Sequence, residues 1–335
     1  MLIRAKRTMK TSQFALFVLF IATWLLFGLI NPGILSLANL FSLTRACIVP
    51  AIFSLALMLI IVQGSFDMSF AMVGAFSSYC SIFILTELGF MQVPLVVPFL
   101  IAIVFAVILE TCNWFFIDRL NLQPFITTLG MQSLLKGAIL AFISTSFIYT
   151  LPDALRNLSV NYLARAAFLD GTESVFHVGF IFTLVLYILI HLMLQYTSFG
   201  RSIYAIGADV AAAQRAGIKV SRVRLATFAL AGVICGIGGI LHDALVRSTV
   251  PIPLDLVGQE LTFIAAVILG CGTSKQARGS VVGTFLAVLF LRFVTTNLIM
   301  LGIPSYWQKI VTGVILFIGL VAQISKKRKY IAGKE

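Results

Sequence analysis

The feature that most constrains this chain is a succession of apolar segments, each close to the length that crosses a lipid bilayer. A helix needs about 20 apolar residues to span the hydrocarbon core. Such segments recur from residue 14 to residue 323, with short polar connections between them. Only 11% of the 335 residues are charged, against about 25% in soluble domains. We therefore expect an all-α, polytopic bundle of helices in the lipid membrane, with residues 1–335 forming a single transmembrane domain.

Hydropathy predicts about ten spans, and the basic residues predict their orientation. The first apolar run is long and has no cleavage motif after it, so it is predicted to be a span rather than a signal peptide. Lys and Arg gather in connections on one side, including residues 201–224 and the tail 324–335, which places both the N- and C-termini in the cytoplasm. The net charge of +12 thus indicates membrane orientation, and nucleic acid is not an expected partner. The predicted spans are residues 14–30, 44–62, 67–86, 94–117, 125–149, 175–196, 223–245, 259–272, 280–301 and 304–323.

No group of residues in the sequence has the pattern of an enzyme active site. The 3 His residues are scattered, and the 5 Cys residues show no C-x-x-C spacing, so neither a metal site nor a disulfide framework is expected. The segment LGCGTSKQARGS from Leu269 does not match the phosphate loop G-x-x-x-x-G-K-[ST]. The pairs Gly232-x-x-x-Gly236 and Gly279-x-x-x-Gly283 predict close helix packing. We expect no catalytic residue and no cofactor on this chain; if ATP drives it, another chain binds the ATP.

Several polar and charged side chains remain at membrane depth. A charge there costs at least about 2.5 to 3.5 kcal/mol on insertion scales, so each must face a partner, a polar cavity or the interface. A functional role is the default interpretation. For Lys136 and Arg292, snorkelling or a structural ion pair is an equally good interpretation. The set comprises Asp67, Asn113, Lys136, Arg292 and Asn297, with Glu110 and Glu260 nearer the ends of spans.

Asp67 is the strongest candidate in this set, because the sequence around it interrupts a helix. Gly64 and Ser65 break the apolar pattern, and Asp67 and Ser69 stand where a new helix would begin. That position suits an N-cap acceptor and a negative charge on the helix dipole. Discontinuous helices occur in transporters where irregular backbone lines a cavity. We predict that Asp67 caps a half-helix; a short cytoplasmic turn capped by Asp67 is the alternative.

Two connections are long enough to hold structure of their own. The outer one, residues 150–174, predicts a short surface helix or a plain loop. The inner one, residues 197–224, has an alanine-rich centre bracketed by Gly207 and Gly217. It predicts a short cytoplasmic helix with small side chains, suited to a groove in another protein. A solvated loop is the alternative.

Several segments of the sequence resemble motifs of one transporter family. They are GSFDMS from Gly64, LQPFITTLG from Leu122, FGRSIYAIGADVAAAQRAGIKVSRVR from Phe199, ELTFIAAVILG from Glu260, RGSVVGT from Arg278 and NLIMLGIPSYWQKIVTGVIL from Asn297. In this order and spacing they are similar to the permease subunits of bacterial ABC importers for ribose, xylose, arabinose, galactofuranose and autoinducer-2. The match covers most of the chain after the first helix.

The chain departs from the family pattern at a few positions. Trp114 follows Asn113 where the family has Gly, and Ser65, Phe66 and Met68 replace Gly, Ile and Leu around Asp67. The family's G-T-S-L-x-G-G-x-G-S appears as the shorter GTSKQARGS. These changes suggest a less common substrate, or one half of a heterodimeric permease.

The resemblance implies partners and candidate residues. It implies a second permease subunit, identical or different, a periplasmic solute-binding protein, and cytoplasmic ATPase chains that use ATP and Mg in the inner membrane complex. The loop from Arg201 to Arg224 would carry the coupling helix that docks on the ATPase. The candidate coupling residues are Arg201, Gly207, Ala211, Ala212, Arg215, Ala216 and Gly217. The candidate pathway or helix-break residues are Gly64, Asp67, Ser69, Asn113, Thr127, Thr128, Asn297 and Gln308.

The predicted function is therefore a non-enzymatic subunit of an importer for a small polyhydroxylated solute, with a monosaccharide as the first candidate. An ion-coupled secondary transporter is the alternative from another class, with Asp67 or Glu110 as its coupling carboxylate. Within the ABC class, an autoinducer or a branched-chain amino acid is an alternative solute. A membrane enzyme would need a nucleophile, a base or a metal cluster, and the sequence shows none of these patterns.

Overall fold

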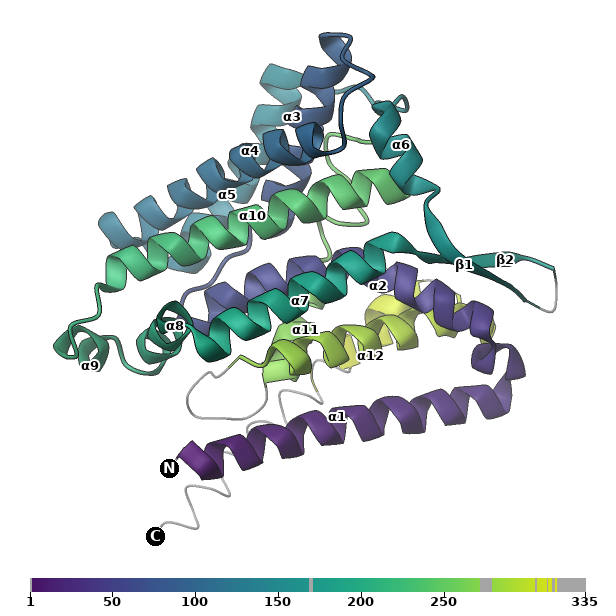
Figure 1. Ribbon diagram of the computed structural model, residues 1–335, viewed down its shortest axis with the longest axis horizontal. Helices are drawn as coiled ribbons and strands as arrows, with labels where there is room; N and C mark the ends of the chain where they lie inside the picture. Colours follow the sequence, from purple (N-terminus) through teal and green to yellow (C-terminus); the bar gives the residue numbers. More distant parts are fainter. Residues whose placement is uncertain are drawn as a thin grey trace. The chain divides into compact units, whose positions relative to one another are not determined.

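Apolar helices make up almost all of the regular structure in this computed structural model (Figure 1). The structure describes residues 2–168, 171–271, 279–304, 306–311, 313–314 and 317, with side chains from residue 13 onward. The helices are α1 (Leu2–Ile30), η1 (Pro32–Leu35), α2 (Leu37–Val62), α3 (Phe70–Glu87), α4 (Val96–Trp114), η2 (Phe115–Arg119), α5 (Pro124–Ala138), η3 (Ile139–Ile143), α6 (Asp153–Ser159), α7 (Val178–Tyr196), α8 (Ser198–Ala208), α9 (Val210–Arg215), α10 (Val220–Val246), α11 (Glu260–Cys271) and α12 (Val281–Met300). The strands β1 (Tyr162–Ala167) and β2 (Glu173–His177) pair in an antiparallel hairpin.

Among the described residues, 8 helices are long and apolar enough to cross a membrane. They are Gln13–Ile30, Leu37–Val62, Phe70–Glu87, Val96–Arg119, Pro124–Ile143, Val178–Tyr196, Val220–Val246 and Val281–Met300. These helices confirm the all-α, polytopic fold and the corresponding predicted spans. The predicted span 259–272 is α11, a shorter apolar helix of 12 residues. The predicted span 304–323 and the basic tail 324–335 lie largely or wholly outside the described residues.

The outer connection contains more structure than the sequence suggested. A short helix was one of the two expectations there, and α6 confirms it. The hairpin of β1 and β2 was not predicted. Its strand β1 has mostly exposed side chains, so it lacks the alternation of apolar and polar residues that reveals a half-buried strand.

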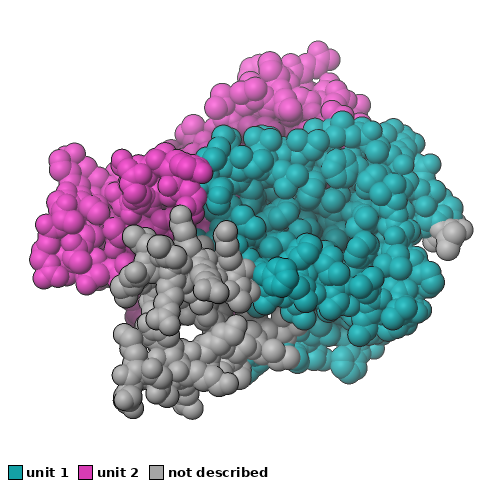
Figure 2. All heavy atoms as spheres, turned by 60° about the horizontal axis from the view of Figure 1, so that its bottom comes forward, with its two compact units in different colours: residues 1–54, 162–192, 262–335 teal, residues 55–161, 193–261 magenta. Residues whose placement is uncertain are grey.

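The contacts divide the chain into two compact units, coloured teal and magenta in Figure 2. Unit 1 comprises residues 1–54, 162–192 and 262–335, and unit 2 comprises residues 55–161 and 193–261. In unit 1, α1 packs on α12, where the rings of Phe20 and Phe293 meet edge to face. The α11 and α12 backbones come so close at Gly283 that an added Cβ would lie 2.1 Å from the Gly270 carbonyl oxygen.

Unit 2 is built around α10, which packs on α3 and α4. Glycines on α10 permit this packing: a Cβ on Gly232 would lie 2.8 Å from the Ala106 oxygen, and one on Gly236 would lie 2.8 Å from the Ile103 Cα. A Cβ on Gly239 would lie 2.2 Å from the Gly74 oxygen of α3. The predicted role of the Gly232–Gly236 pair in close helix packing is therefore confirmed.

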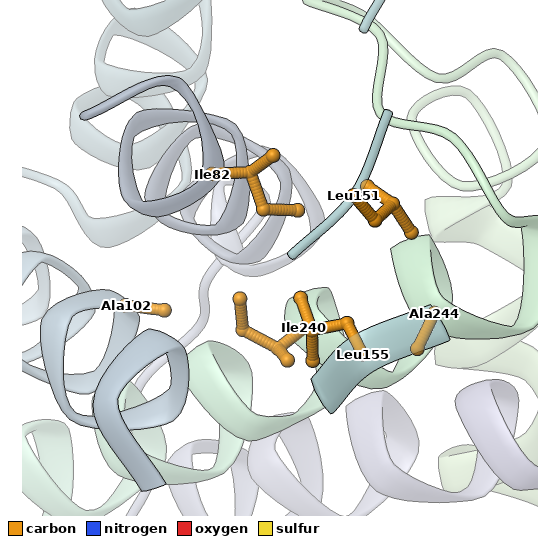
Figure 3. Close-up of a cluster of buried hydrophobic side chains, with 6 residues drawn as sticks. All are labelled: Ile82, Ala102, Leu151, Leu155, Ile240 and Ala244. Carbon is orange, nitrogen blue, oxygen red and sulfur yellow. The ribbon is translucent and has the colours of Figure 1, made fainter. Parts of the chain in front are cut away.

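A cluster of buried apolar side chains holds one end of unit 2 together. It joins α3, α4 and α10 to α6 and to the segment before α6 (Figure 3). Its members are Ile82, Ala102, Leu151, Leu155, Ile240 and Ala244. Because α3 and α4 are fixed here against α10, the polar groups at the start of α3 and the end of α4 are brought to defined positions.

Candidate functional site

The sequence interval between α2 and α3 is a helix break. Residues 63–69 have no helical structure, and Gly64 has a φ of +84°, a conformation that glycine adopts without the steric cost of a side chain. The amides of Gly64 and Ser65 still bond to the last turn of α2, at the carbonyls of Ile61 and Ile60. The predicted interruption of the helix at this point is therefore confirmed, but the predicted half-helix is not, because α3 is by itself long enough to cross a membrane.

Asp67 organises the start of α3. Its Oδ1 accepts hydrogen bonds from the backbone N–H and from the hydroxyl of Ser69, both at 2.7 Å. The backbone N–H of Phe70, the first residue of α3, also donates to this carboxyl group. Ser69 occupies the N-cap position but makes no capping bond with its own side chain. The acceptor for the free amides at the helix start is thus the Asp67 carboxyl group.

Two polar residues of α4 complete a buried cluster with Asp67 and Ser69. The Asn113 amide nitrogen donates to Ser69 Oγ at 2.8 Å and to Glu110 Oε2 at 3.2 Å. The carboxyl groups of Glu110 and Asp67 also lie close enough to form a hydrogen bond if one of them carries a proton. Asp67, Ser69, Glu110 and Asn113 each have a relative exposure of 0%. This set, called the break cluster below, ties the start of α3 to the end of α4.

Helix α5 contributes one further contact to the break. Thr128 Oγ1 accepts from the Met68 N–H at 2.9 Å and lies within 3.0 Å of the Pro124 carbonyl. Thr128 is fully buried. Thr127 was predicted beside it as a pathway residue, but its hydroxyl bonds to the Gln123 carbonyl of its own helix.

The remaining predicted pathway residues belong to unit 1. Asn297 is buried on α12 and donates to the Phe293 carbonyl one turn earlier, at 2.8 Å. Gln308 lies beyond α12 and is half-buried. Of the residues whose role the sequence left open, Lys136 is half-buried on α5 and Arg292 is half-buried on α12. None of these is a member of the break cluster in unit 2.

Glu110 is the member of the break cluster that the predicted pathway residues omitted. The sequence marks it as a carboxyl group near the end of a span, without assigning it to the pathway. The available signal was its spacing from Asn113, because residues three apart on a helix share one face.

The inner connection forms two helices, α8 and α9. Asp209 begins α9, and its Oδ1 accepts from the Ala212 N–H at 3.0 Å. Gly217 follows α9 with a φ of +80°. Ala213 is buried with Ile206 and Val220, whereas the other candidate coupling residues of α9 and its end are exposed: Ala211, Ala212, Arg215, Ala216 and Gly217. The predicted short helix with exposed small side chains is confirmed.

Gly207 occupies a different position from the other coupling candidates. A Cβ built on it would lie 1.8 Å from the Val62 carbonyl oxygen and 3.4 Å from the Gln63 Cα. Val62 is the last residue of α2, and Gln63 is the first residue of the break. The α8 backbone therefore contacts the segment that leads into Asp67. Arg201, also on α8, is exposed and donates to the Tyr196 carbonyl and Ser198 Oγ.

The break cluster offers hydrogen-bonding groups rather than a catalytic arrangement. Three of its polar atoms are buried without a hydrogen-bond partner, namely Asp67 Oδ2, Glu110 Oε1 and Asn113 Oδ1, and both amide atoms of Gln63, the first residue of the break, are also buried and unpaired. Across the described part of the chain, no three His, Cys, Asp or Glu side chains gather in a way that could hold a metal ion. Such an arrangement can fix the start of α3 and present polar groups within an apolar bundle.

Comparisons with known proteins agree with the motifs found in the sequence. The family model described as "Branched-chain amino acid transport system / permease component" matches residues 39–320. The chain is 32% identical to the probable ABC transporter permease protein YphD of Escherichia coli (strain K12), over 93% of this chain and 90% of that protein. It is 27% identical to the ribose import permease protein RbsC of the same strain, over 89% of each chain. It is also 26% identical to the autoinducer 2 import system permease protein LsrC of Klebsiella pneumoniae, over 98% of this chain and 90% of that protein.

Proposed function

This chain belongs to the family of permease components of ABC importers, and we propose that it forms one half of the path by which a small polyhydroxylated solute, most simply a monosaccharide, enters the cell. It is a multi-pass protein of the bacterial inner membrane. A second permease chain, identical or different, would form the other half of the path. A cytoplasmic ATPase would bind and hydrolyse ATP with Mg²⁺, and a periplasmic solute-binding protein would deliver the solute.

The contact of Gly207 with the end of α2 carries this proposal. An ATP-driven permease needs a continuous physical link from the surface that touches the ATPase to the segment that lines the path. Here the exposed alanines of α9 follow directly after α8, and the α8 backbone lies against Val62, next to the helix break. A displacement of α8 by the ATPase would therefore act on the backbone just before Asp67.

The chemistry of the break cluster favours a neutral solute. A branched-chain amino acid carries a carboxylate that needs a basic partner. In the described structure, Asp67 and Glu110 interact with each other and with Ser69, Phe70 and Asn113, and with no Lys or Arg. Neutral hydroxyl groups instead need donors and acceptors such as the unpaired Asn113 Oδ1 and the Gln63 amide. The relatives named for ribose and autoinducer 2 import support the same class of solute.

An ion-coupled carrier is the competing function, and ATPase binding separates the two. We would purify the wild type, Ala212→Arg and Val160→Arg from the host and score the bound ATPase. Ala212 is exposed on α9, so an arginine there blocks docking without disturbing a core. Val160 is also exposed, at the end of α6 in the outer connection, and serves as the matched control.

The expected result is an ATPase retained by the wild type and by Val160→Arg and lost from Ala212→Arg. If no ATPase accompanies any form while all three are folded and monodisperse, the ABC function is refuted. If Ala212→Arg still binds the ATPase, α9 is not part of the surface on which the ATPase docks.

A further inference from the structure

The break cluster contains two carboxyl groups that no basic side chain in the described part of the chain neutralises. Asp67 and Glu110 have a relative exposure of 0%, and each uses one oxygen to accept hydrogen bonds from Ser69 or Asn113. The other oxygens, Asp67 Oδ2 and Glu110 Oε1, receive no N–H or O–H from another described residue. A buried acceptor without a donor is costly, and two buried negative charges without a counter-charge are far more costly.

The two carboxyl groups face each other. They are within hydrogen-bonding reach, as described above. An ionised carboxylate is an acceptor only, so a hydrogen bond between two carboxyl groups requires a proton on one of them. A single proton shared between the two carboxyl groups would give the pair a hydrogen bond and reduce its charge by one.

The surroundings supply no other source of positive charge. Helix α10 packs on both α3 and α4, and its titratable side chain that interacts with the pair is the thiol of Cys235. Helix α5 contributes the hydroxyl of Thr128, which is already bonded to the Met68 N–H. Helix α4 adds the neutral amide of Asn113. In the described structure, the charge of the carboxyl pair is therefore set by its own protonation.

We propose that Asp67 and Glu110 form a proton-binding site that holds one proton, shared between the two carboxyl groups. The proton binds to the ionised pair from water and leaves to water, and no bond between heavy atoms changes. Sodium is the competing monovalent cation, but the close approach of the two carboxyl groups favours a proton, which they can share directly. This inference requires neither a bound ATPase nor a particular solute.

The bound proton has a structural consequence. It joins the first turn of α3 to α4 in parallel with the bond from Asn113 to Ser69. When it leaves, two carboxylates remain at hydrogen-bonding distance and repel each other. Loss of the proton therefore loosens the start of α3, the element that Asp67 caps.

Infrared difference spectroscopy on the purified permease in lipid vesicles at neutral pH tests this proposal. A protonated carboxylic acid has a C=O stretching band that a carboxylate lacks, and the band shifts in ²H₂O. We would compare the wild type with Glu110→Gln and Asp67→Asn, in which the new amide can donate to the remaining carboxylate and keep the cluster bonded. Glu87→Gln, at the exposed end of α3, is the matched control.

We expect one C=O band of a protonated acid to be lost in both Glu110→Gln and Asp67→Asn and retained in Glu87→Gln. Unchanged bands in both cluster variants would overturn the proposal. A band that appears in the wild type only after sodium is removed would also overturn it, in favour of a sodium site. Because the permease is measured alone, none of these results bears on whether it binds an ATPase.

Discussion

Gly207→Ala is the sharpest test of the path by which the ATPase would act on the helix break. The added Cβ would lie 1.8 Å from the Val62 carbonyl oxygen, and real Cβ atoms essentially never come within 3.0 Å of a heavy atom. Since the obstacle is backbone, α8 or the end of α2 has to move by roughly 1 Å or more, and overpacking of this kind costs about 1 to 3 kcal/mol. Where this cost falls on only one of the transport states, about 1 to 3 kcal/mol shifts their equilibrium by about 5- to 150-fold, so we expect uptake to fall by at least about fivefold.

The assay measures solute uptake and ATP hydrolysis by the reconstituted importer. We expect Gly207→Ala to retain the bound ATPase, because the exposed face of α9 is unaltered, but to lose at least about fivefold in uptake per ATP hydrolysed. Gly137→Ala is the matched control: Gly137 lies inside α5 and has no atom within 4 Å of an added Cβ. Wild-type uptake by Gly207→Ala, with normal expression, would show that this contact does not transmit the movement.

Further substitutions test the break, the packing of α10 and the outer end of unit 2. Asp67→Ala removes the hydrogen-bond acceptor at the start of α3, so we expect it to abolish most transport at normal expression. Asp67→Asn is expected to retain more transport. Normal uptake by Asp67→Ala would exclude both a capping and a pathway role. Gly239→Ala places a Cβ 2.2 Å from the Gly74 oxygen, so we expect destabilisation by about 1 to 3 kcal/mol, measured by thermal unfolding in detergent. His242 contacts Asp243 at 3.0 Å and Asp255 at 2.9 Å, and His242→Phe is expected to increase hydrogen exchange in residues 247–259; an unchanged exchange rate would show that the loop is held by other contacts.

The sequence predicted the elements of this fold better than the contacts between them. Span length and the Gly64–Asp67 interruption are local features, and the structure places the described spans and the break where they indicate. The composition of the α9 helix is local in the same way. The β1–β2 hairpin was missed because its strands carry no alternation of apolar and polar residues for a periodicity argument to detect.

The contacts that matter for function depend on packing between distant segments. Glu110 joins Asp67 only because α4 lies beside α3, and nothing near residue 110 specifies that neighbour. From the sequence, Gly207 is predicted to be a helix breaker next to an alanine-rich helix, whereas the structure places it against Val62. Both contacts join residues that are far apart in the sequence, so only the folded structure reveals them.

The carboxyl pair makes the ion-coupled alternative a specific hypothesis. If the proton were the driving ion, its movement down a gradient across the membrane would power uptake, and collapse of that gradient with a protonophore would abolish solute accumulation even when ATP is present. In an ATP-driven importer the proton only stabilises the closed break, and the free energy for uptake comes through α8 and α9. We therefore expect vesicles that contain the complete importer and ATP to accumulate solute equally with and without a protonophore at constant pH. Glu110→Gln should preserve that accumulation under the ABC function, because its amide keeps the bond to Asp67, and should abolish it under the ion-coupled function, because an amide cannot release a proton.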